Sequence, residues 1–137
     1  MRRIFVDSSY WIALRNRQDR YHADSKRIAR WLIDNRFYLV VTPFIFAETH
    51  AYFSRVPEIR EMVIRDFWEN PIVKIEQPSP KDHIHAIELL HQRDKTYSFA
   101  DAVSFVVVDR LELRQAVSYD GHFHQFGQFK VIDGRHL

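Results

Sequence analysis

Short apolar runs alternate along the chain with longer segments whose apolar side chains follow helical spacing. The short runs, rich in Val, Ile and Phe, favour buried β-strands and lie at 4–6, 37–41, 72–75, 115–118 and 129–132. The longer segments favour helices and lie at 8–14, 22–35, 44–54, 58–69, 80–91 and 98–111. Strands of this kind, separated by helices, predict an α/β fold of three α/β/α layers around a central, mostly parallel sheet of about five strands.

Proline, serine and glycine residues help to define where several of these helices and strands begin or end. Pro43 and Pro57 are placed to open helices, and Ser79 and Ser98 are placed to cap them. The Asp120-Gly121 pair follows a predicted strand and indicates a turn. No repeat, low-complexity tract or glycine-rich phosphate loop interrupts the pattern. We therefore expect a single domain that spans residues 1–137.

Composition narrows the class of protein. The chain has 137 residues, of which 46% are hydrophobic and 28% charged, enough for one sizeable core. It has no cysteine, which excludes disulfides, thiolate metal sites and cysteine nucleophiles. The apolar run at the N-terminus is too short for a signal peptide or a membrane span, so we expect a cytoplasmic protein. A net charge of +2 permits a nucleic-acid partner without requiring one.

Two aspartates follow predicted strands. Asp7 ends the first strand and Asp120 the fourth, and parallel α/β sheets place their ligand crevice at the carboxyl ends of strands. Each has an ordinary structural explanation, because Asp7 is also a good helix cap and Asp120-Gly121 a common turn. Position alone does not separate a structural role from a functional one.

Two further carboxylates belong to predicted helices. Glu48 has apolar neighbours at helical spacing, so we expect it on or beside an apolar face, neutralised by an arginine or by a metal ion. Asp101 stands in Ser98-Phe99-Ala100-Asp101, the spacing of a capping box, before a nearly all-apolar and therefore central helix. The start of such a helix should open into the interior or into a cleft.

The four carboxylates gain meaning together. Converging without cations they would repel one another and raise each other's pKa, whereas a divalent ion would stabilise them all as ligands. Hard oxygen donors favour Mg²⁺ or Mn²⁺. The sequence therefore predicts an acidic metal pocket formed by Asp7, Glu48, Asp101 and Asp120.

With these residues in place, the chain resembles the PIN-domain family, and in particular the VapC-type ribonuclease toxins of toxin–antitoxin pairs. The resemblance covers essentially the whole chain and rests on Ile4-Phe5-Val6-Asp7-Ser8-Ser9, Phe46-Ala47-Glu48, Phe99-Ala100-Asp101-Ala102 and Ser118-Tyr119-Asp120-Gly121-His122-Phe123. It implies that Asp7, Glu48, Asp101 and Asp120 are catalytic metal ligands supported by Ser8 and Ser118. His122 is a departure, since relatives often carry an acidic or polar residue there, which leaves one-metal occupancy open.

The resemblance also implies an activity and partners. The implied reaction is hydrolysis of RNA phosphodiester bonds with Mg²⁺ or Mn²⁺, by the toxin component of a type II toxin–antitoxin system. The implied partners are RNA, a cognate antitoxin whose C-terminal segment covers the groove, and a second copy of the chain that docks through helices near the N-terminal half. The alternatives are a noncatalytic PIN-fold module that binds RNA or protein, and a metal-dependent phosphatase acting on a small molecule.

Side chains outside the acidic set supply candidates for substrate contacts. Phosphates could be held by five basic residues, Arg15, Arg17, Arg20, Arg93 and Lys95. Unpaired bases could stack on Tyr10, Trp11 or Tyr97, with core packing the expected role for Trp11. The histidine pairs His83/His85 and His122/His124 lack the spacing of a zinc protease, so we expect surface or structural roles for them.

Overall fold

The protein folds around one five-stranded sheet. The structure, a computed structural model, describes residues 2–135 and 137. Its strand order is β3-β2-β1-β4-β5, and every neighbouring pair is parallel. The predicted α/β class is therefore confirmed, with a sheet that is parallel throughout. The strands are β1 (Arg2–Val6), β2 (Phe37–Val41), β3 (Val73–Ile75), β4 (Gln115–Val117) and β5 (Lys130–Ile132).

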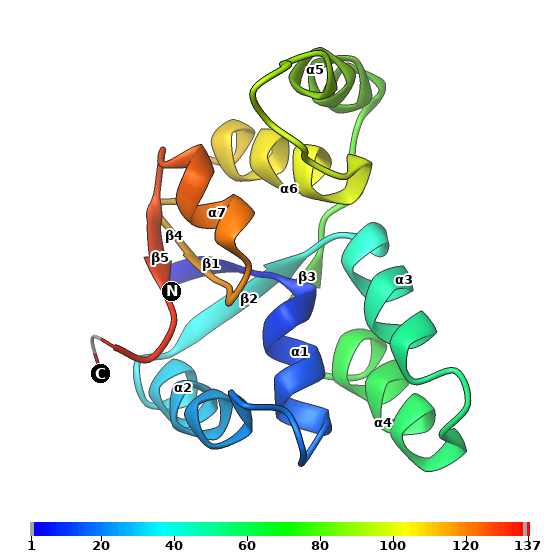
Figure 1. Cartoon of the computed structure of the whole chain (residues 1–137). Coiled ribbons are helices and arrows are strands. Elements are labelled where there is room, and N and C mark those ends of the chain that lie inside the picture. The colour runs from blue at the N-terminus through cyan, green and yellow to red at the C-terminus, as the bar shows by residue number, and fades with distance from the viewer. Residues whose placement is uncertain (1, 136) are drawn as a thin grey trace.

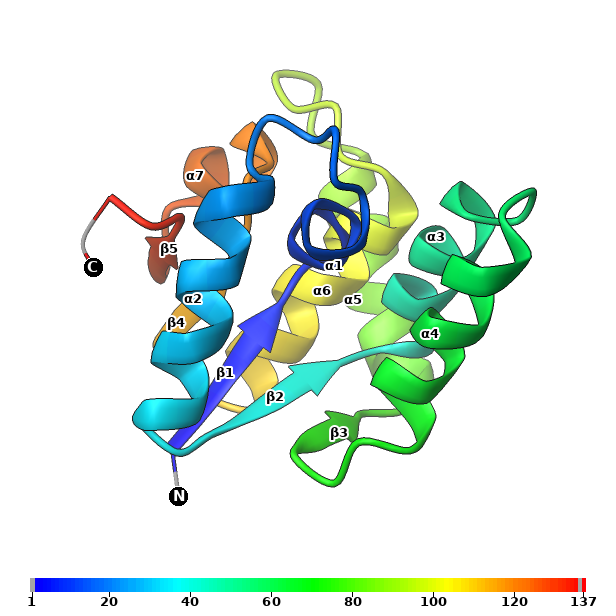
Figure 2. The same cartoon turned by 90° about the horizontal axis from the view of Figure 1, so that it is seen from below.

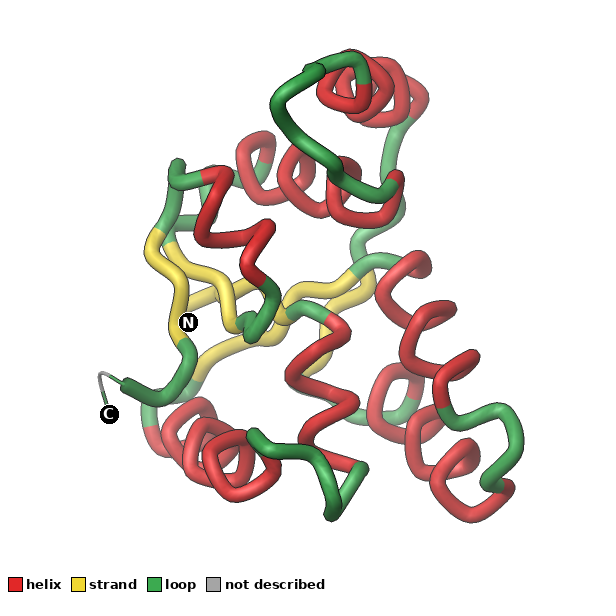
Figure 3. Tube along the Cα trace, in the orientation of Figure 1, coloured by secondary structure: helices red, strands yellow, loops and turns green. Residues whose placement is uncertain are grey.

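Helices cover both faces of this sheet, as Figure 1 shows and the tube in Figure 3 repeats. They are α1 (Ser8–Arg15), α2 (His22–Asp34), α3 (Pro43–Tyr52), α4 (Pro57–Trp68), α5 (Pro80–Leu90), α6 (Phe99–Arg110) and α7 (Gly121–Phe126). In Figure 2, α1 is seen end-on between α2 and the α3–α4 pair. On the opposite face α6 contacts both α5 and α7. The three-layer arrangement is as predicted.

The strand order fixes where a crevice can form. β1 lies in the middle of the sheet, and the chain leaves it for β2 on one side and reaches β4 on the other. This reversal is a topological switch point, and ligands of parallel sheets bind at the carboxyl ends of the strands beside it. Asp7 directly follows β1 and Ser118 directly follows β4. The sheet thus brings two segments 111 residues apart to the same edge.

The core is built from the strands and from α6. Ile4, Phe5 and Val6 of β1 are completely buried, because β1 is covered on both faces. α6 buries seven of its twelve residues, which agrees with the central position that its apolar composition predicted. None of the helices among the described residues combines the length and apolar character needed to span a membrane.

The sequence did not predict α7, since the Asp-Gly pair indicated only a turn. Asp120 caps this six-residue helix and Gly127 ends it in the left-handed conformation, with φ 73°. A helix this short is marginal in isolation, so tertiary packing must hold it. Phe123 and Phe126 supply that packing, with ring centroids 4.9 and 4.5 Å from Phe105 of α6.

Candidate active site

Asp7 is the most deeply buried of the candidate carboxylates. It caps α1, and its Oδ2 accepts hydrogen bonds from the hydroxyls of Ser9 at 2.8 Å and Ser118 at 2.9 Å. Asp7 is only 3% exposed. Burial raises the pKa of its carboxyl from 3.8 to about 6, and the negative charges of Asp120 and Asp101 contribute to that rise. The capping role and the site role therefore coexist.

Ser118 and Tyr119 position the loop that carries Asp120. The Ser118 hydroxyl, which donates to Asp7, also accepts from the backbone N–H of Asp120 at 3.0 Å. The backbone N–H of Tyr119 donates to the hydroxyl of Ser9 at 2.9 Å, and its ring stacks on Tyr21 at 4.1 Å. These contacts tie the loop to the start of α1, so the ends of β1 and β4 form one rigid corner.

Asp101, Asp120 and His122 form a compact cluster at this corner. One donor atom from each of the three lies within 4.8 Å of the others. His122 Nδ1 is 2.8 Å from Asp101 Oδ2 and 3.6 Å from Asp120 Oδ1. Asp101 is 7% exposed and also completes the predicted capping box with Ser98. The sequence assigned His122 a surface or structural role, whereas the structure places it among the carboxylates.

Glu48 belongs to α3 and lies near enough to Asp7 and Asp101 for their charges to affect it. The Ser8 hydroxyl is 3.4 Å from its Oε1. Partial burial, together with Asp7 and Asp101, raises the pKa of Glu48 from 4.5 to about 7. We expected Glu48 on or beside an apolar face, and the structure instead places it on the exposed side of α3. Within the described residues no Lys or Arg forms an ion pair with it, so the arginine alternative finds no partner there.

The donor set suits a hard divalent cation. Among the described residues the only basic group that pairs with Asp101 or Asp120 is His122, and Asp7 accepts only from two hydroxyls and the backbone N–H of Ser9. Burial raises the pKa of Asp7 and of Glu48, and the negative charge of neighbouring carboxylates raises both further. A divalent ion would offset that charge, and carboxylate oxygens are the donors that Mg²⁺ and Mn²⁺ prefer.

The basic residues proposed for phosphate contacts fall into different environments. Arg15 forms a two-pronged ion pair with Asp66 of α4, at 2.7 and 2.6 Å, so its guanidinium already has a structural partner. Arg17 and Arg93 are exposed. Arg20 lies over the ring of Tyr21, with its Cζ 4.5 Å from the ring centroid. Because Tyr21 stacks on Tyr119, Arg20 is connected to the loop that carries Asp120.

Lys95 and the aromatic candidates complete the set. Lys95 lies in the loop between α5 and α6, partly buried. Tyr10, Trp11 and Tyr97 are 2%, 3% and 8% exposed and belong to the core. The core role expected for Trp11 is confirmed, whereas the burial of Tyr10 and Tyr97 does not fit the base-stacking interpretation. Packing at the ends of α1 and α6 draws such large rings inward.

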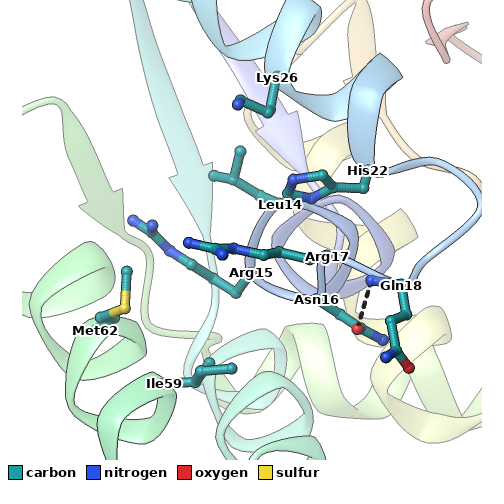
Figure 4. Close-up of a pocket in the computed structure, with 9 residues that line it drawn as sticks. All are labelled: Leu14, Arg15, Asn16, Arg17, Gln18, His22, Lys26, Ile59 and Met62. Atoms are coloured by element: carbon teal, nitrogen blue, oxygen red, sulfur yellow. Dashed lines mark hydrogen bonds between the residues drawn. The ribbon is translucent and has the colours of Figure 1, made fainter.

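A separate cavity of about 550 Å³ lies at the C-terminal end of α1 (Figure 4). Its lining combines cationic side chains with the apolar side chains of Leu14, Ile59 and Met62. Arg17 and Lys26 supply positive charge to this lining (Figure 4). The eight residues of α1, about 12 Å of helix, separate the cavity from Asp7. It is therefore a different surface from the carboxylate site.

Known proteins resemble this chain in sequence and in fold. No protein-family model matches the chain. The chain is 30% identical over 130 residues to the 23S rRNA-specific endonuclease VapC20 of Mycobacterium tuberculosis, an alignment covering 93% of this chain and 97% of the relative. The crystal structure of VapC20, a sarcin-ricin loop cleaving toxin, matches with a TM-score of 0.81 at 27% identity, covering 93% of this chain and 98% of that one. VapBC2 from Rickettsia felis, bound to a promoter DNA fragment, matches with a TM-score of 0.71 at 12% identity over 95% of this chain and 97% of that one, a likeness of fold alone.

Proposed function

Because the chain belongs to the VapC family of PIN-domain ribonuclease toxins, we propose that it hydrolyses RNA phosphodiester bonds at the pocket formed by Asp7, Glu48, Asp101 and Asp120. The observation that carries this assignment is the convergence of Asp101, Asp120 and His122 donors within 4.8 Å at the carboxyl edge of the sheet. When bound there, a divalent ion would supply Lewis-acid polarisation of the phosphate and a nucleophile at neutral pH.

Side chains of the protein orient the carboxylates and the attacking water molecule. Ser9 and Ser118 hold the Asp7 carboxylate in one orientation through short hydroxyl donations. Ser98 fixes the first turn of α6, which directs Asp101 toward the same point. Glu48 is exposed to solvent, and its carboxylate would orient an attacking water molecule or take a proton from it. Cleavage then needs no covalent intermediate.

The substrate class follows from the relative. VapC20 is a 23S rRNA-specific endonuclease, and the two chains align over nearly their full lengths. We therefore take 23S ribosomal RNA as the first substrate to test. Arg17, Arg20 and Arg93 are exposed and carry the charge for phosphate contacts, whereas Arg15 is committed to Asp66. Action on ribosomes implies a cytoplasmic location.

An antitoxin is part of the same proposal. The cavity at the C-terminal end of α1 offers apolar contacts at Leu14, Ile59 and Met62 beside the cations of Arg17 and Lys26. Such a lining fits a peptide segment that carries apolar and acidic side chains. A short reading frame upstream that encodes a small DNA-binding protein would identify the candidate. Co-purification with the chain, lost in an Ile59→Asp variant, would place the contact.

The activity itself is tested with purified protein. Ribosomes, single-stranded RNA and single-stranded DNA are incubated separately with Mg²⁺, Mn²⁺ or a chelator, alongside an Asp7→Asn, Asp101→Asn double variant. We expect metal-dependent cleavage of RNA that the double variant loses. Equal cleavage by both proteins would indicate a contaminant, and RNA binding without cleavage would favour a noncatalytic module. Cleavage of a phosphomonoester but not of RNA would favour a phosphatase.

A further inference from the structure

His122 has a position that the carboxylate set alone does not explain. It is the second residue of α7, and its backbone N–H donates to Asp120 Oδ1 at 2.9 Å. Its ring turns away from the helix axis toward Asp101, with Nδ1 2.8 Å from Asp101 Oδ2. Tyr97 packs edge-on against the imidazole, with ring centroids 5.7 Å apart. The nitrogen is therefore aimed into the acidic pocket by contacts on two sides.

The donors of His122, Asp101 and Asp120 lie within 4.8 Å of one another, close enough for one ion to contact all three. Neighbouring ligands of an octahedral ion with bonds of about 2.1 Å are separated by about 3 Å. His122 Nδ1 is separated by 2.8 Å from Asp101 Oδ2 and by 3.6 Å from Asp120 Oδ1, which bracket that value. His124, two residues further on, is 3.6 Å from Asp133 instead and does not join the cluster.

We infer that His122 is a metal ligand through Nδ1 and gives this site a mixed nitrogen and oxygen donor set selective for Mn²⁺ over Mg²⁺. The reason is chemical: imidazole nitrogen suits transition-metal ions, whereas Mg²⁺ prefers oxygen donors and retained waters. Without an ion, Nδ1 carries a proton and donates it to the Asp101 carboxylate. For Nδ1 to bind an ion, the ring would give its Nδ1 proton to solvent and take one from solvent at Nε2, so it would change tautomer and stay neutral; the side chain, 34% exposed, is open to that exchange.

This inference rests on the proposed function, because it concerns the same pocket. His122 supplies a nitrogen donor where a carboxylate oxygen could have been. We therefore expect the site to keep its ion and to prefer Mn²⁺ over Mg²⁺. A purely structural His122 would instead be a hydrogen-bonding clamp between α6 and α7. Removing such a clamp would lower stability and would leave the preference between the two ions unchanged.

The test measures metal binding on the protein alone. Affinities for Mn²⁺ and Mg²⁺ are compared by titration calorimetry in the wild type, His122→Ala, His122→Asp and the matched control His124→Ala. Pulsed EPR of the Mn²⁺ form reads nitrogen hyperfine coupling directly. We expect the ratio of Mn²⁺ to Mg²⁺ affinity to fall at least about tenfold in both His122 variants. Losing a partner that only orients a ligand already weakens metal binding by about tenfold or more, and losing a ligand itself should cost at least as much. Nitrogen coupling should vanish in them and persist in His124→Ala.

Each result has a defined meaning. An unchanged affinity ratio in His122→Asp, which keeps a donor at the position, together with no nitrogen coupling in the wild type would overturn the inference. RNA cleavage by the wild type in that case leaves the proposed function standing. Nitrogen coupling in a wild type that cleaves no RNA would overturn the proposed function and keep the metal ligand. Circular dichroism melting of each variant ensures that folded proteins are compared.

Discussion

Asp7 shows how one residue can serve structure and chemistry at once. It is an ordinary N-cap by its bonds to Ser9, yet desolvation beside other carboxylates raises its pKa to about 6. Without an ion, burying this charge at neutral pH costs free energy that two hydroxyl donors and the backbone N–H of Ser9 offset in part. The residue is therefore destabilising where it is ionised, as expected of a group kept for function rather than for folding.

Asp7→Asn tests this cost through its pH dependence. The pKa of Asp7 in the folded protein, about 6, lies above its ordinary value of 3.8, which we take for the unfolded chain. The stability that the neutral carboxyl contributes is therefore fully present below about pH 4 and is lost as the pH rises through 6. Asn keeps the neutral shape at every pH. In chelator we expect the variant to match the wild type at pH 4 and to exceed it at pH 8 by up to about 3 kcal/mol. Thermal unfolding that shows the same difference at both pH values would contradict the shifted pKa.

Two helices begin with the same Ser-x-x-Asp capping box and use it differently. In α5 the box aspartate, Asp82, binds Arg110 of α6 at 3.0 Å, whereas in α6 the box aspartate, Asp101, faces His122. Sequence alone could place both boxes at helix starts, since the motif is local. It could not tell a structural ion pair from a site, because that depends on which segment packs opposite.

Removing each cap separates the two roles. Ser98→Ala and Ser79→Ala should each lower stability by about 1 kcal/mol, since each removes one side-chain acceptor at a helix start. Only Ser98→Ala should also slow RNA cleavage, because it loosens Asp101 and leaves the α5 contacts intact. Chemical denaturation and cleavage rates measured on the same preparations check both statements. Equal losses of activity would mean that cleavage merely follows stability.

At the scale of the whole molecule, the alternation of strand and helix patterns was enough to predict the layers and the parallel sheet. It also placed Asp7 and Asp120 at one edge, because the carboxyl ends of parallel strands meet there. The sequence placed Glu48 in the acidic set but did not predict its exposure, and it did not place His122 among the carboxylates. Their positions depend on how α3 and the unpredicted α7 pack, which no local pattern encodes.

The homodimer that the resemblance implied, through helices near the N-terminal half, stays a prediction, and we propose an exposed apolar row on α5 as its contact. Three apolar side chains lie exposed at three-residue spacing along α5: Ile84 (57%), Ile87 (48%) and Leu90 (39%). This helix lies outside the N-terminal half, where the resemblance implied the dimer contact. Ile87→Asp should shift the protein from dimer toward monomer in sedimentation experiments. Ile33→Asp on α2, at a 65% exposed position, is the control and should leave the dimer intact. A dimer that survives Ile87→Asp but dissociates with Trp68→Asp would place the contact on α4 instead.

The central claim, that the acidic pocket performs the cleavage, is tested most directly by the single-turnover cleavage rate of Asp101→Asn beside Asp109→Asn on the same helix. Asn at 101 can still accept from Ser98, and Asp109 is an exposed carboxylate away from the cluster. We predict a loss of more than about 100-fold for Asp101→Asn, beyond the effect of outer-shell partners, and a wild-type rate for Asp109→Asn. Metal-dependent cleavage that continues at the wild-type rate in Asp101→Asn would contradict the account.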